Sequence, residues 1–334
     1  MASFLCIGDL HIKLSNIDII RQVKKELIKV IQKKSPNYVV LLGDMHDSFE
    51  KIHMQVWNEI IDFINDLTKV STQVYYIVGN HDMLNNQVFL SKDHFFNAFK
   101  NWNGNPIIVD SPTILPLGNK WVGFLPYVPP GRFGEAIEAL MPTGKPYGKC
   151  AAIFAHQEFH GISFGPVLSE KGDKYPESYP LVISGHIHEY QWFRKNILYV
   201  GSPYQTNFGE MDDKSVSLIT IGDSIIEERI RLDVPKNTII EATRQEFEEI
   251  SINDFDKFKI IISGSMEDIL AIKKTKKFKE LGDNVKVIFR TNDKPIVKKN
   301  INNLAFLELL KIEVDKESEA VKEIFSEVLR EINT

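Results

Sequence analysis

The sequence predicts an α/β protein, a sandwich of two β-sheets with helices, followed by a smaller C-terminal domain. Short apolar runs rich in β-branched and aromatic residues recur through the first two thirds of the chain, as in buried strands. Early in the chain these runs alternate with helical patterns, and later they follow one another closely. That order is typical of helices packed on two sheets. The pattern changes at residues 233–238, which indicates a domain boundary.

The first domain is expected to span residues 1–232. Residues 17–33 and 56–67 have apolar side chains spaced for one face of a helix. Loops are expected at residues 126–134, which are rich in proline and glycine, and at residues 142–148. Strands are expected at residues 3–7, 38–42, 74–78, 106–110, 113–117, 121–126, 151–155, 181–184, 197–200 and 216–221.

The second domain is expected to be a small α/β cap at residues 239–300. A strand at 257–263, a lysine-rich helix at 266–281 and a strand at 285–290 would form a β-α-β unit. Residues 301–334 predict a helical tail. One face of this tail carries an apolar stripe of Val321, Ile324, Phe325, Val328, Leu329 and Ile332.

The composition is that of an ordinary globular protein. Of 334 residues, 43% are hydrophobic and 25% charged, and the formal net charge is -5. This charge does not indicate a nucleic-acid binder, yet bound metal ions or local basic patches would supply a positive field. Cys6 and Cys150 are flanked by apolar residues and are expected to be small buried hydrophobes. We see no signal peptide and no membrane span, so a cytoplasmic location is expected, or the host-cell cytoplasm if the protein is viral.

Polar residues that can bind metal ions follow five of the predicted strands. Five of the nine histidines lie in or beside these segments. Alone, each segment has a simple explanation as a turn, a structural histidine or a surface pair, but their joint occurrence favours a site for two divalent cations. The segments are Gly8-Asp9-Leu10-His11, Gly43-Asp44, Gly79-Asn80-His81-Asp82, His156 and Gly185-His186-Ile187-His188.

The residue types suggest roles for each ligand. Asp44, from the middle segment, is the natural bridge between two cations. Asp9 and His11 are two residues apart, so they leave a strand on the same side and can hold one cation. Asn80 would offer its amide oxygen to the other cation, and His186 and His188 would serve one cation each. Such a pair of cations neutralises a phosphate ester and activates water, which predicts phosphate ester hydrolysis.

Three further residues are expected to take part in catalysis. His81 adjoins a ligand and is better placed as a general acid or as a group that orients the phosphate. Asp82 would fix the tautomer of His81 or support the turn. Asp47, together with His46, follows the bridging residue closely and is expected to line the substrate pocket. His94 is expected at the surface.

These segments resemble the calcineurin-like metallophosphoesterase superfamily. Its pattern is Asp-x-His, Gly-Asp, Gly-Asn-His-Asp/Glu, His and Gly-His-x-His, in that order. The resemblance implies a metallophosphoesterase four-layer αββα sandwich and makes His81 the catalytic histidine. It implies one metal site of Asp9, His11, Asp44 and His188, and a second of Asp44, Asn80, His156 and His186.

Within the superfamily the chain resembles the SbcD family, the nuclease subunits of Mre-type complexes for double-strand-break repair. The similarity lies in Gly43-Asp44-Met45-His46-Asp47, in Tyr199–Pro203 with Asn207–Glu210, and in the small cap. The chain departs from that family at His46, where an aromatic residue is usual. The resemblance implies a nuclease that uses manganese, with magnesium as the alternative. It implies 3′→5′ exonuclease action on double-stranded DNA and endonuclease action on single strands.

The same resemblance implies partners: DNA, an SbcC-type SMC-like ATPase and a second copy in a homodimer. The tail stripe would dock on the ATPase or pack on its own cap. Five cap lysines would neutralise DNA phosphates or form a solvated helix face: Lys273, Lys274, Lys276, Lys277 and Lys279.

Two other functions stay open. One is a phosphatase or cyclic-nucleotide phosphodiesterase with the same core. The other is a scaffold without activity that serves an ATPase partner, against which the intact ligand set argues.

Overall fold

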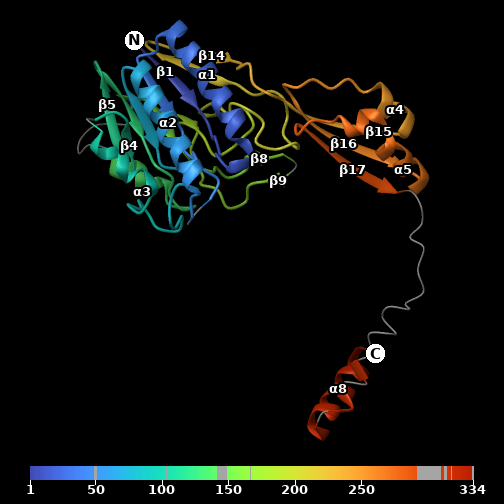
Figure 1. Ribbon diagram of the computed structural model, residues 1–334. Helices are drawn as coiled ribbons and strands as arrows, with labels where there is room; N and C mark the ends of the chain where they lie inside the picture. Colours follow the sequence, from blue (N-terminus) through green and yellow to red (C-terminus); the bar gives the residue numbers. More distant parts are fainter. Residues whose placement is uncertain are drawn as a thin grey trace. The chain divides into compact units, whose positions relative to one another are not determined.

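The computed structural model describes residues 1–48, 51–102, 104–140, 149–165, 167–291, 310–311, 314–316 and 318–332 (Figure 1). Contacts between residues divide the chain into two compact units. The first comprises Met1–Ile240, Ser251–Lys259 and Gly282–Lys286, and the second comprises Glu241–Ile250, Ile260–Leu281 and Val287–Thr334. Each is described by itself. No helix in the described part of the chain is both long and apolar enough to cross a lipid bilayer.

A mixed six-stranded sheet begins at the N-terminus. Its order is β14-β13-β1-β2-β3-β4, with β1 to β4 parallel and β13 and β14 antiparallel to their neighbours. The parallel order places the carboxyl ends of β1, β2 and β3 at one edge. The strands are β1 (Ala2–Ile7), β2 (Tyr38–Leu41), β3 (Val74–Ile77), β4 (Ile107–Val109), β13 (Val216–Ile221) and β14 (Ile225–Ile230).

A second six-stranded sheet has the order β11-β12-β10-β7-β6-β5. Strands β6, β7, β10 and β12 are parallel, and β5 and β11 form antiparallel edges. The strands are β5 (Thr113–Leu117), β6 (Lys120–Phe124), β7 (Cys150–Ala155), β10 (Leu181–Ser184), β11 (Gln191–Phe193) and β12 (Ile197–Tyr199).

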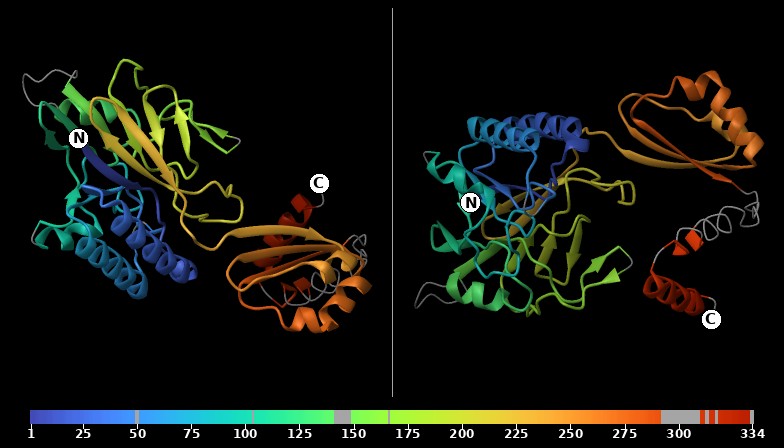
Figure 2. Two further views of the ribbon diagram at one scale, coloured as in Figure 1. Left: turned by 90° about the horizontal axis from the view of Figure 1, so that it is seen from above. Right: turned by 60° about the horizontal axis from the view of Figure 1, so that its bottom comes forward.

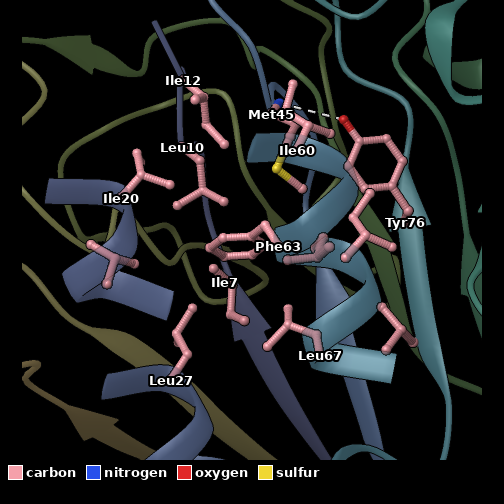
Figure 3. Packing of buried hydrophobic residues seen from close by; sticks show 14 of the residues in the cluster. Ile7, Leu10, Ile12, Ile20, Leu27, Met45, Ile60, Phe63, Leu67 and Tyr76 are labelled. Atoms are coloured by element: carbon pink, nitrogen blue, oxygen red, sulfur yellow. Dashed lines mark hydrogen bonds between the residues drawn. The ribbon is translucent and has the colours of Figure 1, made fainter. Parts of the chain in front are cut away.

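Helices cover the outer face of each sheet. Helices α1 (Ile17–Lys34) and α2 (Met54–Val70) lie side by side on the first sheet, and α3 (Phe133–Leu140) lies on the second. In the right view of Figure 2, α1 and α2 lie above the sheets and the green α3 lies below them. Figure 3 shows Phe63 of α2 packed among the side chains of β1 and α1.

The two sheets pack face to face through an apolar layer. Phe4 of β1 meets Phe154 of β7 with ring centroids 4.9 Å apart, and Phe154 stacks on Phe124 of β6 at 5.1 Å. Residues in β1 alternate between this layer and the helices, since Phe4 and Cys6 face the second sheet while Leu5 and Ile7 face α1 and α2. The result is four layers in the order α, β, β, α, and the predicted fold class is confirmed.

Several short elements differ from the prediction. Residues 126–134 were expected to be a loop, but α3 begins at Phe133. Strands β11 and β14 and the hairpin of β8 (Ser163–Phe164) and β9 (Val167–Leu168) were not expected. Short 3₁₀ segments lie at Leu14–Asn16 and Phe95–Asn101. The expected loop at 142–148 lies outside the described residues.

The C-terminal region contains a three-stranded sheet in the order β15-β16-β17. Its elements are β15 (Asn237–Ala242), α4 (Arg244–Glu249), β16 (Lys257–Gly264), α5 (Met266–Lys274), α6 (Lys276–Lys279) and β17 (Val285–Thr291). The expected helix at 266–281 is therefore broken. The break is at Thr275, which is extended and caps α6 by accepting a hydrogen bond from Phe278 N. In the tail, the structure describes α8 (Glu319–Ile332), while residues 301–309 lie outside the described part.

Asp110, directly after β4, anchors residues 92–100. Its carboxylate accepts hydrogen bonds from Lys92 Nζ at 2.9 Å and from Lys100 Nζ, and it lies 3.2 Å from His94 Nε2. His94 is 9% exposed, so the expected surface position is wrong. Its imidazole is buried because it pairs with the buried carboxylate of Asp110. Burial raises the pKa of Asp110, but His94, Lys100 and Lys92 lower it overall, well below its usual value.

Because the pKa of Asp110 is lower in the folded than in the unfolded protein, its ionised carboxylate stabilises the fold at pH values above the unfolded pKa, which is about 4 for aspartate. This stabilisation is lost as the pH falls toward the folded pKa. We expect Asp110→Asn to lower the free energy of unfolding by about 1–3 kcal/mol at pH 7. The difference from the unsubstituted protein should shrink at pH 3, as measured by urea denaturation. Asp93→Asn, at a neighbouring exposed aspartate, is the control. A difference of equal size at pH 7 and pH 3 would contradict this account.

Candidate dimetal site

The site lies where the carboxyl ends of the parallel strands of both sheets meet. Asp9, Asp44 and Asn80 follow β1, β2 and β3 of the first sheet. From the second sheet, His156 follows β7 and His186 follows β10. Asp9, Asp44, Asn80 and His156 are buried. Parallel strands end at the same edge, which is why residues far apart in sequence converge here.

One cluster consists of Asp9, His11 and His188. One potential ligand atom from each lies within 4.8 Å of the others. The Nε2 atoms of His11 and His188 are 3.0 Å apart, and they lie 3.9 and 3.7 Å from Asp9 Oδ2. Two imidazole nitrogens and a carboxylate oxygen therefore face a common point.

A second cluster consists of Asp44, His156 and His186, with Asn80 beside them. His156 Nε2 lies 3.3 Å from Asp44 Oδ2 and 2.9 Å from Asn80 Oδ1. His186 Nδ1 lies 2.9 Å from the same amide oxygen. This second group again combines carboxylate, amide and imidazole donors.

Asp44 lies between the two clusters. Its Oδ2 atom, which faces His156, is also 3.8 Å from His11 Nε2. A third cluster joins Asp44 to His11 and His81. The structure thus brings together all seven residues expected as metal ligands, with Asp44 in the position that a bridging carboxylate needs.

The outward-facing ring nitrogens fix the histidine orientations. His156 Nδ1 donates to the Leu42 carbonyl oxygen at 2.6 Å, so its Nε2 presents a lone pair to the site. His188 Nδ1 lies 2.9 Å from Glu210, and His11 Nδ1 lies 3.3 Å from Asp47. His186 is turned the other way, with Nε2 3.6 Å from Glu158.

The donor set therefore fits two divalent cations. Each inward imidazole nitrogen is matched by a carbonyl or carboxylate on its outer side, which is the usual arrangement around metal-bound histidine. Imidazole with carboxylate and amide oxygen suits several divalent transition metals, and the donor set does not single out one of them.

The electrostatics of the site match this interpretation. Burial raises the pKa of Asp44, but the nearby imidazoles of His156, His11 and His81 lower it overall. Burial lowers the pKa of His156, whereas Asp44 and Asp9 raise it overall, to about 9. The carboxylates thus create a negative field at this point, which attracts either a proton or a metal cation.

The backbone around the ligands is unusual. His11, Asp44 and His186 have φ angles of 42°, 49° and 76°, in the left-handed region that such residues seldom adopt. Strained conformations of this kind cluster at functional sites, where surrounding contacts maintain them. Gly79 must be glycine for a different reason, because a Cβ atom there would lie 2.2 Å from Asp44 Oδ1.

The three expected catalytic residues take different positions. His81 lines the cavity above the clusters, and its backbone N–H donates to Asp44 Oδ1 at 2.9 Å. Asp82 is buried and accepts hydrogen bonds from the N–H groups of Gly79, Asp44 and Met45 at 2.8, 3.0 and 3.1 Å. Its position therefore supports the turn. Asp47 lines the cavity and faces His11.

Sequence reasoning did not assign a role to Glu210 or Glu158. Burial raises the pKa of Glu210, but His188 and Lys214 lower it overall, to about 2, so it is ionised beside His188. Glu210 stands in one of the segments that carried the family resemblance, which was the available signal. Glu158, two residues after His156, had no signal in the sequence.

Comparisons with known proteins agree with this geometry. The sequence model of a family described as "Calcineurin-like phosphoesterase" matches residues 2–190. The chain belongs to this family. It is 39% identical over 279 residues to "Putative phosphoesterase 244L" of Invertebrate iridescent virus 6, which covers 81% of this chain and 97% of the viral protein.

A second viral protein, "Putative phosphoesterase 078R" of Invertebrate iridescent virus 3, is 36% identical over 284 residues, with 84% of this chain and 81% of the relative covered. A crystal structure of a protein of unknown function from Aquifex aeolicus matches 48% of this chain and 80% of its own, at 18% identity and a TM-score of 0.30. No argument depends on that likeness. The family establishes a phosphoesterase.

We expect Gly79→Ala to weaken metal binding about tenfold or more, because the added methyl group displaces the Asp44 carboxylate. Gly134→Ala is the matched control, since a Cβ at this glycine of α3 meets nothing within 4 Å. Titration calorimetry with manganese measures both. Unchanged binding by Gly79→Ala would contradict the position of Asp44.

We expect Glu210→Gln to weaken the binding of one cation about tenfold while the other is retained, because the variant keeps the shape but removes the charge behind His188. Glu228→Gln, which removes an exposed carboxylate from β14, is the control. Equal losses at both cations, measured by the same titration, would count against a local role for Glu210.

Proposed function

We propose that this phosphoesterase is a metal-dependent DNA nuclease. It would act as a 3′→5′ exonuclease on double strands and as an endonuclease on single strands, in DNA recombination and double-strand-break repair. The observation that carries the proposal is the ligand set around Asp44 at the floor of an open cavity of about 540 Å³. A cavity of this size admits a phosphate with a large substituent.

The segment similar to the SbcD family supports a DNA substrate. Within it, Glu210 contacts His188, and Asn207 lines the cavity beside it. The segment similar to that family therefore lies beside the candidate ligand His188 and lines the cavity.

The mechanism combines the cations with side chains of the cavity. When bound, two divalent cations, manganese in our proposal, neutralise the phosphate and lower the pKa of the attacking water. Asp44 would contribute its carboxylate to holding both. His81, on the cavity wall, either gives a proton to the leaving oxygen or orients the phosphate. Lys13 Nζ, 3.2 Å from Asp47 Oδ2, adds a positive charge to the same wall.

Partners of the nuclease form part of the proposal. The tail helix α8 exposes Val321, Ile324 and Val328, and we propose that this stripe docks on an SbcC-type SMC-like ATPase. Packing on its own cap is the alternative. We also propose that the chain forms a homodimer, as the SbcD family does.

The cap lysines divide into two groups. Lys277 Nζ donates to the Glu248 and Ile250 carbonyl oxygens, and Lys273 lies over the Phe289 ring at 4.9 Å. These two have structural roles. The proposed DNA contacts of the cap therefore fall to Lys274, Lys276 and Lys279.

The nuclease is tested with the purified chain, manganese and labelled DNA. Linear duplex, hairpin and single-stranded substrates are compared with p-nitrophenyl phosphate. Cleavage of DNA supports the nuclease, whereas turnover of the small ester alone supports a phosphatase. Inactivity toward all substrates, even with an ATPase partner added, supports a scaffold.

His81→Ser separates the two roles that its position permits. We expect this variant to keep both cations, as measured by calorimetry, and to lose cleavage, because a catalytic group is removed without a ligand. Asn80→Ala should instead lower the occupancy of one cation. His160→Ser, at an exposed histidine, is the control. Loss of metal binding in parallel with activity in His81→Ser would make His81 a ligand, in line with its cluster with His11 and Asp44.

A further inference from the structure

A second cavity of about 550 Å³ adjoins the cavity above the metal site. Its walls come from the segment after β1, the segment after β2 and the start of α2. Lys13 lines both cavities, so the two meet at this side chain. The cavity plays no part in the chemistry described above.

The wall between the two cavities is thin and fixed by hydrogen bonds. Leu10 N and His11 N donate to the Asp44 carbonyl oxygen at 3.1 and 3.0 Å, and Ile12 N donates to the Met45 carbonyl oxygen at 2.8 Å. These bonds join the two segments that carry the metal ligands Asp9, His11 and Asp44.

Residues of the joined segments face the two cavities in turn. His11, Asp44 and Asp47 line the metal cavity, whereas Ile12 and His46 line the second. A group in the second cavity is therefore separated from the metal site by the width of one backbone.

The second cavity combines positive charge with apolar surface. Lys13 and Lys51 supply two ammonium groups, and Leu14, Ile52 and Val56 supply aliphatic surface. Leu14 is 51% exposed, so its side chain is accessible to a ligand in the cavity. A phosphate with an attached planar base presents the complementary combination of charge and apolar faces.

His46 also lines this wall. It is 1% exposed and packs edge-on against Phe95, with ring centroids 4.8 Å apart. Its Nδ1 accepts a hydrogen bond from Ser48 N at 3.2 Å, while its Nε2 is buried with no hydrogen-bond partner among the described residues. Because this nitrogen is buried, His46 contributes the surface of its ring to the cavity wall rather than a hydrogen-bonding group.

We propose that the second cavity is a subsite for the nucleotide next to the phosphodiester being cleaved. Lys13 and Lys51 would meet its phosphate, and Leu14, Ile52 and Val56 would pack against its base. The inference rests on the proposed nuclease function and deepens it. It also gives a reason for a preference for nucleic acid over small esters, since only a polynucleotide reaches both cavities.

The test compares two substrates in two variants. Lys51→Ala and Leu14→Ser change exposed residues of the subsite outside the metal cluster. For a single-stranded oligonucleotide with manganese, each should raise KM roughly fivefold or more. For p-nitrophenyl phosphate, kcat/KM should change less than about twofold, because this ester occupies only the metal cavity. Lys33→Ala, at an exposed lysine near the end of α1, is the matched control.

A second readout is independent of turnover. An oligonucleotide with a photoreactive base is irradiated with the protein in chelator, and cross-linked peptides are identified by mass spectrometry. We expect adducts on residues 12–15 or 51–56, reduced in Lys51→Ala and Leu14→Ser and unchanged in Lys33→Ala.

The outcomes separate the two proposals. If the protein cleaves DNA but both variants match Lys33→Ala and the adducts lie elsewhere, the proposed subsite is wrong, whereas the proposed nuclease activity is supported. If the protein hydrolyses the small ester and neither cleaves nor cross-links to DNA, the nuclease and the subsite both fall. A selective loss of oligonucleotide affinity with the expected adducts supports the subsite.

Discussion

The Asp44 carboxylate is the constraint on which the site depends. Its Oδ1 accepts from His81 N at 2.9 Å, its Oδ2 faces His156 and His11, and its carbonyl oxygen accepts two further N–H groups. A negative charge this deeply buried requires positive partners. The imidazoles that face it come from both sheets, His11 after β1 and His156 after β7, so the electrostatics of the site and the packing of the sandwich are coupled at this residue.

Asp82 maintains this geometry. Its carboxylate holds the N–H groups of Gly79, Asp44 and Met45 together with the hydroxyl of Tyr76 at 2.5 Å. Four donors to one buried carboxylate fix the turns after β2 and β3 relative to each other. The hydrogen bonds from Asp44 N and Met45 N to Asp82 therefore maintain the left-handed conformation of Asp44, at a φ of 49°. Asp82 is next to His81 in sequence, yet its hydrogen bonds hold the backbone on either side of Asp44.

The bounds of strands could be predicted from the sequence where the local signals are strong. Thr113–Leu117, Leu181–Ser184 and Val216–Ile221 have the predicted bounds, because each is a short apolar run with clear breaks. The sequence was insufficient where tertiary contacts decide. α3 has only eight residues after a proline-rich loop, Thr275 breaks a helix through a cap, and Glu158 reaches the site through its contact with His186. The seven residues expected as ligands, which the structure brings together, could be chosen because a strand-end pattern marks each of them.

The same backbone that carries the candidate ligands His11 and Asp44 also forms the wall of the second cavity. Since His11 and Asp44 face one side while Ile12 and His46 face the other, the proposed function assigns chemistry and recognition to neighbouring residues. His46 stands where the resembling family has an aromatic residue, and its side chain lines the second cavity. In the proposed nuclease, a substitution at this position would alter the surface beside the cleaved phosphodiester, while Asp9, His11 and Asp44 would keep their positions.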